Sequence, residues 1–229
     1  MLDVLIAEDN ITSSVHLCNA INSSNVRCVG ILNDGINVYK KTKELNPDVL
    51  LLDLKMPSKD GLNILEEIQE DKALNTRIFI YSGETEYIAL ARKYKCVNRF
   101  FSKLTPPEEI SRELEEASEE IYNKNTENKV IEILLKLGFS YALRGTRLLD
   151  SCIMYSINED EDNLNNIYEI IAQRTGENAH TTKSNISTAI NSMWKYTDRS
   201  KTRRILRLGE NEKPSAKTII AMVKYYIQK

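Results

Sequence analysis

The chain has few of the residues that build zinc sites and disulfide frameworks, and it has no long apolar run. It has only two histidines and four cysteines among 229 residues, and no two cysteines stand in a C-x-x-C spacing. We therefore expect reduced, buried thiols rather than disulfides or a zinc site. No apolar run approaches the roughly 18 residues of a membrane span, and the start Met1-Leu2-Asp3 lacks the basic stretch of a signal peptide. These absences predict a cytoplasmic protein that does not enter a membrane.

Charges of the two signs are unevenly distributed. The net charge is only −2, but residues 1–127 hold 15 basic and 22 acidic side chains, whereas residues 128–229 hold 16 and 11. The length suits two small domains. We expect an acidic N-terminal domain joined to a basic domain that meets a polyanion.

Acidic residues follow two apolar runs in the first half. Asp53 directly follows the run 49–52, and Glu8 and Asp9 follow the run at the N-terminus. Four successive apolar residues indicate a strand that is covered on both faces, and ligands of such parallel sheets collect at the carboxyl ends of strands. Clustered carboxylates repel one another unless a cation such as Mg²⁺ neutralises them. The sequence therefore predicts a magnesium site there.

Two further strand-like runs end in polar residues, at Ser82 and at Lys103. Helical patterns at 11–24, 35–45, 61–70, 85–94 and 107–122 alternate with the strands. This (βα)₅ order predicts an α/β domain with a parallel sheet and right-handed crossovers over residues 1–122. Residues 123–129 contain no apolar side chain and read as an interdomain linker.

The acid pair, the Asp-x-x-Met-Pro-x-x-Asp-Gly motif at 53–61, the hydroxyl and the lysine together resemble the receiver domain of two-component response regulators. The resemblance implies that a sensor histidine kinase or phosphotransfer protein phosphorylates the chain, which is not itself an enzyme. It also implies one role for each matching residue: Asp53 as phosphoacceptor, Glu8, Asp9 and Asp53 as Mg²⁺ ligands, Ser82 as switch hydroxyl, Lys103 as phosphate-binding lysine and Phe100 as switch aromatic. Taken singly, Ser82 and Phe100 would read as a polar strand end and a core aromatic.

Two positions depart from the receiver pattern. Leu104 stands where receivers carry proline, which argues against a cis peptide after Lys103, because a non-proline cis bond costs about 3 kcal/mol. Gly83 replaces the usual alanine after Ser82 and loosens that loop. Neither change removes a functional group, so we expect phosphorylation to persist.

Residues 130–229 are predicted to be all-helical. Spacings near 3.6 cover 130–137, 141–157, 164–174, 180–194 and 215–227. Ile171-Ala172-x-x-x-Gly176 is how many helix-turn-helix units begin. This fragment alone leaves DNA binding and generic helix packing equally open.

The wider stretch resembles the C-terminal domain of the stage-zero sporulation protein A family, through Trp194, Lys213-Pro214 and the segment 220–223. The resemblance implies that a helix beginning near Ala179 enters the major groove of double-stranded DNA. It further implies a homodimer when phosphorylated or on DNA, RNA polymerase as a partner, and a role in sporulation.

The candidate reading helix lacks the arginine and glutamate typical of this family. Its candidate DNA-reading residues are His180, Thr181, Lys183, Ser184, Ser187 and Asn191, where Asn191 suits adenine and Lys183 suits guanine. A solvated polar face is the alternative. The candidate phosphate contacts are the cations that follow: Lys195, Arg199, Lys201, Arg203, Arg204 and Arg207.

The sequence thus predicts a phosphorylation-gated, DNA-binding transcription regulator. The alternative is a signalling module without sequence-specific DNA binding, which acts as a phosphate sink or binds a partner protein.

Overall fold

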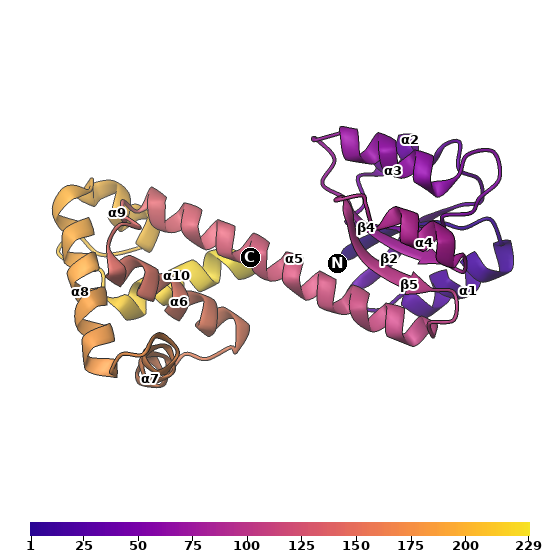
Figure 1. Ribbon diagram of the computed structural model, residues 1–229. Coiled ribbons are helices and arrows are strands. Elements are labelled where there is room, and N and C mark those ends of the chain that lie inside the picture. The colour runs from indigo at the N-terminus through magenta and orange to yellow at the C-terminus, as the bar shows by residue number, and fades with distance from the viewer. The chain divides into compact units, whose positions relative to one another are not determined.

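Two units divide the chain, Met1–Ile121 and Tyr122–Lys229, and the computed structural model describes every residue from 1 to 229. The first unit alternates strands and helices, and the second is helical throughout (Figure 1). The predicted fold class is confirmed. Among the helices of both units, none combines the length and the apolar composition that a membrane span requires.

The first unit is a sheet of five parallel strands in the order β2-β1-β3-β4-β5. Its elements are β1 (Leu2–Ala7), α1 (Ile11–Ile21), β2 (Val26–Leu32), α2 (Val38–Leu45), β3 (Val49–Leu52), α3 (Gly61–Glu70), β4 (Arg77–Ser82), α4 (Thr85–Ala91), β5 (Val97–Ser102) and the first part of α5 (Pro107–Lys136).

Helices cover both faces of this sheet (Figure 1). Successive side chains of β3 point to opposite faces. Val49 and Leu51 pack with α1 and α5, whereas Leu50 and Leu52 pack with α2, α3 and α4. All four side chains are buried. The apolar run therefore forms a central strand. Its burial on both faces holds the strand end, and the residue that follows it, in place at the sheet edge.

The second unit buries a single apolar core. Its helices are the last part of α5, α6 (Arg144–Asn158), α7 (Leu164–Thr175), α8 (Ala179–Tyr196), α9 (Arg199–Leu206) and α10 (Ala216–Gln228). Gly145 lets α6 approach α8 closely, because a Cβ atom there would lie 1.9 Å from the carbonyl oxygen of Asn185. Hence α8 is held against the core along one face, which leaves its opposite face to solvent.

Two segments differ from the sequence-based reading. Residues 123–129 lie within α5 and are helical. They contain no glycine or proline that would end a helix, and Thr126 is buried. Part of the basic run forms α9, whose N-terminus is capped by Asp198 and whose Thr202 and Leu206 are buried one turn apart. The high charge of that segment hid this helical spacing.

Candidate functional site

Three carboxylates meet at one edge of the sheet. Glu8 and Asp9 directly follow β1 and Asp53 directly follows β3, and these two strands are neighbours. In the order β2-β1-β3-β4-β5 the connections reverse direction between β1 and β3, where ligands of open α/β sheets bind. One carboxylate oxygen from each of the three residues lies within 4.8 Å of the others. The predicted cluster is thus brought together.

Lys103, one residue beyond β5, bridges two of these acids. Its Nζ lies 2.9 Å from Glu8 Oε1 and 2.5 Å from Asp53 Oδ2. Burial alone would lower the pKa of Lys103, but the hydrogen bonds to Asp53 and Glu8 outweigh it and raise the pKa. Burial raises the pKa of the Glu8 carboxyl, against the opposing effect of Lys103. The ammonium therefore remains charged and offsets part of the clustered negative charge.

Two buried oxygen atoms at this edge have no partner. Glu8 Oε2 and Ser82 Oγ accept and donate no hydrogen bond, although both side chains are fully buried. A buried polar atom without a partner costs about 1–3 kcal/mol. A divalent cation would satisfy the Glu8 oxygen, since carboxylates are ligands that Mg²⁺ prefers. The Ser82 hydroxyl is free to bond a new acceptor, so the residues present fit both a metal ion and a phosphoryl group.

The turn after Asp53 explains the Asp60-Gly61 pair. Asp60 caps α3, because its Oδ1 accepts a hydrogen bond of 2.9 Å from the backbone N–H of Asn63. Gly61 lies so close to Asp53 that a Cβ atom would sit 2.7 Å from the Asp53 carbonyl oxygen. Only glycine fits there without a shift. This packing fixes the backbone of the residue that carries the central carboxylate.

Phe100 and Leu104 lie on either side of Lys103 in the chain. Phe100 is half-buried, and the guanidinium carbon of Arg92 lies 5.0 Å from the centre of its ring. Leu104 is 92% exposed, and the chain has no cis peptide bond, as expected from leucine at this position.

An ion pair spans the loops beside the carboxylates. Lys55 Nζ lies 2.8 Å from Glu84 Oε1, and both side chains are largely exposed. Lys55 is two residues after Asp53 and Glu84 is two residues after Ser82. The strands that lead into these two loops, β3 and β4, are neighbours in the sheet, which brings together residues that are 29 apart in the sequence.

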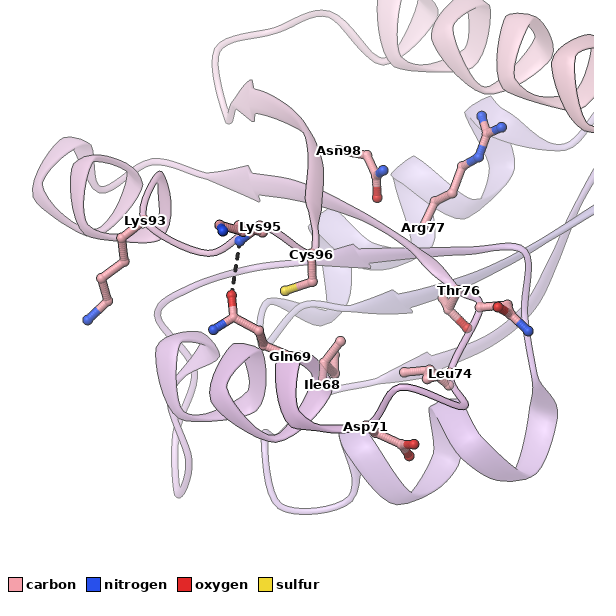
Figure 2. A pocket seen from close by; sticks show the side chains of 11 residues that line it. Ile68, Gln69, Asp71, Leu74, Thr76, Arg77, Lys93, Lys95, Cys96 and Asn98 are labelled. Atoms are coloured by element: carbon pink, nitrogen blue, oxygen red, sulfur yellow. Dashed lines mark hydrogen bonds between the residues drawn. The ribbon is translucent and has the colours of Figure 1, made fainter.

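A surface hollow lies at the other end of the sheet (Figure 2). It has a volume of about 690 Å³ and borders the start of β4, whereas Ser82 ends the same strand. Its cations do not converge: Lys93 and Arg77 point away from each other in Figure 2, and Arg77 pairs with Glu120 at 2.8 Å. The amide oxygen of Gln69 accepts a hydrogen bond from the backbone N–H of Lys95. Arg77 and Gln69 thus form contacts within the protein and do not point together at a ligand. We therefore do not assign the functional site to this hollow.

In the second unit, α7 and α8 form a helix-turn-helix. Gly176 ends α7 with a φ of 70°, in the left-handed region, and the N–H of Glu177 donates to the carbonyl oxygen of Ala172 at 2.9 Å. Asn178 then caps α8 by accepting a hydrogen bond of 2.8 Å from the N–H of Thr181. Glu177 also forms an ion pair with Arg144 of α6. These contacts fix the start of α8.

The outer face of α8 carries the predicted reading residues. Its inner face buries Ile186, Ala189 and Ile190. The side chains exposed to solvent include every candidate: His180, Thr181, Lys183, Ser184, Ser187 and Asn191. The polar pattern of the sequence therefore corresponds to one solvent-facing surface.

The candidate phosphate-binding cations at the end of α8 and in α9 fall into two groups. Arg199 and Arg203 lie over the ring of Trp194, with their guanidinium carbons 5.5 and 5.3 Å from its centre. Arg203 is half-buried, and its Nε has no partner. The remaining cations, Lys195, Lys201, Arg204 and Arg207, are exposed. Arg203 thus stabilises the packing of α9 on α8, while the second group faces solvent.

Two family models match this chain. Residues 4–115 match the response regulator receiver domain, and residues 130–227 match the sporulation initiation factor Spo0A C-terminal domain. The chain belongs to the response regulators of the stage-zero sporulation protein A family.

Curated relatives resemble part of the chain. Protein-glutamate methylesterase/protein-glutamine glutaminase 5 of Myxococcus xanthus is 34% identical over 90 residues, which make up 38% of this chain and 26% of that protein. Chemotaxis protein CheY of Listeria monocytogenes is 34% identical over 68 residues, or 30% of this chain and 57% of CheY. The aligned part spans only 26% and 34% of the first two methylesterases. Residues 130–227 of this chain match the Spo0A C-terminal domain.

Solved structures resemble about half of the chain. The receiver domain of AraT, a response regulator from Geobacillus stearothermophilus, is 25% identical with a TM-score of 0.49, covering 54% of this chain and 98% of that domain. The response regulator domain of Thermotoga maritima CheB is 24% identical with a TM-score of 0.44, covering 52% of this chain and 95% of that one.

We predict that Asp53 is the only residue that becomes phosphorylated. Incubation with acetyl phosphate and Mg²⁺ should add one phosphoryl group to the wild type and none to Asp53→Asn, as measured by intact mass. The exposed control Asp34→Asn should be labelled like the wild type. Labelling of Asp53→Asn, or labelling unchanged by EDTA, would contradict the assignment.

We also predict that the Lys55–Glu84 ion pair slows loss of the phosphoryl group. Lys55→Ala and Glu84→Ala should each speed dephosphorylation about two- to fivefold, because exposed ion pairs are weak. The double variant should lose the phosphoryl group no faster than the single variants, since each removes the same interaction. Lys41→Ala, which breaks an exposed pair on α2 (Lys41–Glu44), serves as control. Unchanged dephosphorylation rates in both single variants would show that the ion pair does not affect the lifetime of the phosphoryl group.

Proposed function

We propose that Asp53 accepts a phosphoryl group from a sensor histidine kinase or phosphotransfer protein, and that phosphorylation lets the second unit bind double-stranded DNA through α8. The observation that carries this proposal is the convergence of Glu8, Asp53, Lys103 and the unpartnered Ser82 hydroxyl at one sheet edge. The same chain carries a helix-turn-helix with an exposed polar face. A phosphoacceptor unit and a DNA-binding unit would thereby be joined in one chain.

The chemistry follows from these side chains. An Asp53 carboxylate oxygen forms a bond to phosphorus while the bond between phosphorus and the donor's histidine nitrogen breaks. Lys103 already contacts Asp53 at 2.5 Å, so its ammonium can follow the charge onto the phosphoryl oxygens. Glu8, Asp9 and Asp53 would hold Mg²⁺, which supplies positive charge to those oxygens.

The switch would begin at Ser82. Its hydroxyl, which has no partner in the fold, would donate a hydrogen bond to a phosphoryl oxygen. The loop after β4 would move toward Asp53, and Phe100 on the neighbouring β5 would turn into the space vacated. The ring is half-buried, which leaves it room to change rotamer.

Exposed apolar side chains near the acids support docking of the phosphodonor. Ile11 is 66% exposed and lies three residues after Glu8, and Leu104 is 92% exposed and follows Lys103. Such side chains on a charged edge suit a protein partner that excludes water from the transfer.

On DNA, α8 would lie in the major groove with its solvent-facing residues toward the bases. Lys195, Lys201, Arg204 and Arg207 would contact phosphates, and Arg199 would do so while stacked on Trp194. We assign Arg203 to packing as well as to phosphate contact. A homodimer on tandem sites and contact with RNA polymerase rest on the family resemblance.

An electrophoretic mobility shift tests whether phosphorylation controls DNA binding. The probe is duplex DNA selected for binding from a randomised pool. We expect acetyl phosphate with Mg²⁺ to increase the affinity of the wild type and to leave Asp53→Asn unchanged, because only the wild type forms the acyl phosphate. Size-exclusion chromatography with light scattering of the same samples measures the dimer. A phosphorylated protein that binds no duplex even at low salt would favour a phosphate sink or a partner-binding role.

We predict that exposed cations of α9 anchor the phosphate backbone without reading sequence. Arg204→Ala should weaken binding to all duplexes alike and reduce the slope of log K against log[salt] by about 1, the value for one lost phosphate contact. Lys40→Ala, on α2 of the receiver, should leave the slope unchanged. A loss restricted to one sequence would instead place Arg204 among the reading residues.

A further inference from the structure

A lysine outside α8 contacts its reading face. Lys213 Nζ donates a hydrogen bond to Asn191 Oδ1, although the two residues are 22 apart in the sequence. Both side chains are exposed. Lys213 is thus placed beside the polar face of α8.

The backbone around Lys213 is fixed by its neighbours. Pro214 is buried, and Ser215 caps α10 by accepting a hydrogen bond of 3.1 Å from the N–H of Thr218. The α10 helix packs into the same core as α8 through Ile219 and Val223. The ammonium of Lys213 bonds an amide oxygen rather than a carboxylate, so its positive charge is not neutralised there.

Asn191 shares its face of α8 with other candidate reading residues. His180, Ser184, Ser187 and Asn191 are spaced by four, three and four residues and therefore lie along one side of the helix. All four are exposed. A groove that receives this side of α8 would also meet Lys213.

The hydrogen bond changes what Asn191 can recognise. An asparagine that reads adenine accepts from N6 through Oδ1 and donates to N7 through Nδ2. Here Oδ1 is bonded to an ammonium, whose positive charge also disfavours the amino group of adenine. Oδ1 keeps a second lone pair, but it lies beside that positive charge. The unhindered groups are the amide N–H₂ group and the remaining N–H groups of Lys213, all of which are donors.

We propose that Asn191 and Lys213 form a composite donor that reads guanine. In the major groove guanine presents two acceptors, N7 and O6, and no donor, which matches a pair that offers donors only. The inference rests on the proposed DNA binding through α8 and names the base that this part of α8 selects. Lys213 is then a specificity-determining residue that lies outside the helix-turn-helix.

The test is a selection from randomised duplexes with the full-length, phosphodonor-treated protein, followed by Kd measurements on the selected site. We expect one position to require G·C, with A·T there raising the wild-type Kd about tenfold, within the range for a bidentate contact. Lys213→Met should lose this preference and accept adenine, because Asn191 Oδ1 is released. Asn191→Ala should lose it too, and the double variant should show no further loss. Lys217→Met, an exposed lysine on α10, should behave as the wild type.

Three other results would contradict the inference, and each has a distinct meaning. An equal loss on all duplexes for Lys213→Met identifies a phosphate contact, and an unchanged G·C preference removes Lys213 from reading. Either result leaves the proposed function standing. Failure of the wild type to bind any duplex overturns both. Fluorescence of Trp194, the single tryptophan, checks that each variant retains the fold of α8.

Discussion

Clustered negative charge at the carboxyl edge of the sheet is the constraint on which the receiver depends. The ends of β1 and β3 carry three acids whose oxygens lie within 4.8 Å of one another, and the ammonium of Lys103 bridges two of them. Repulsion between such groups would otherwise favour their protonation. One lysine offsets only part of the charge, and Glu8 Oε2 remains without a partner. The edge is therefore held ready for a cation and, through Asp53, for a phosphoryl group.

The same constraint links phosphorylation to movement. The phosphoryl group would carry about −1.5 to −2 charges at neutral pH, against the single negative charge of the Asp53 carboxylate that it replaces. Lys103 contacts Glu8 and Asp53 at once, so under the proposed function a stronger anion on Asp53 would redistribute its hydrogen bonds. Ser82, whose hydroxyl has no partner, would gain an acceptor at the same time. Both responses would pull on the ends of β4 and β5, where the loops carry Glu84 and Leu104. The ion pair of Glu84 with Lys55 would then oppose access of water from the adjoining loop.

The sequence predicted what depends on local order. Acids that directly follow buried strands must meet at the sheet edge, because parallel strands end on the same side, and this placed Asp53 and Glu8 correctly. The exposed face of α8 followed from helical spacing in the same way. Helix α9 was missed, because its cap at Asp198 and its two buried residues are surrounded by cations. The contact of Lys213 with Asn191 could not be predicted, since only the packing of α10 brings residues 22 apart together.

The few long polar side chains on the outer face of α8 limit how well a single copy could discriminate between DNA sequences. A reading face of serine, threonine, asparagine and lysine forms fewer bidentate base contacts than one rich in arginine, so each site provides little discrimination. Phosphate contacts by the exposed cations of α9 would increase affinity for all sequences equally and would not compensate for this. Two copies on tandem sites multiply both affinity and discrimination, because the second copy binds at a high effective concentration. Dimerisation driven by the receiver would therefore contribute more to specificity in this chain than in relatives whose reading helix carries arginine.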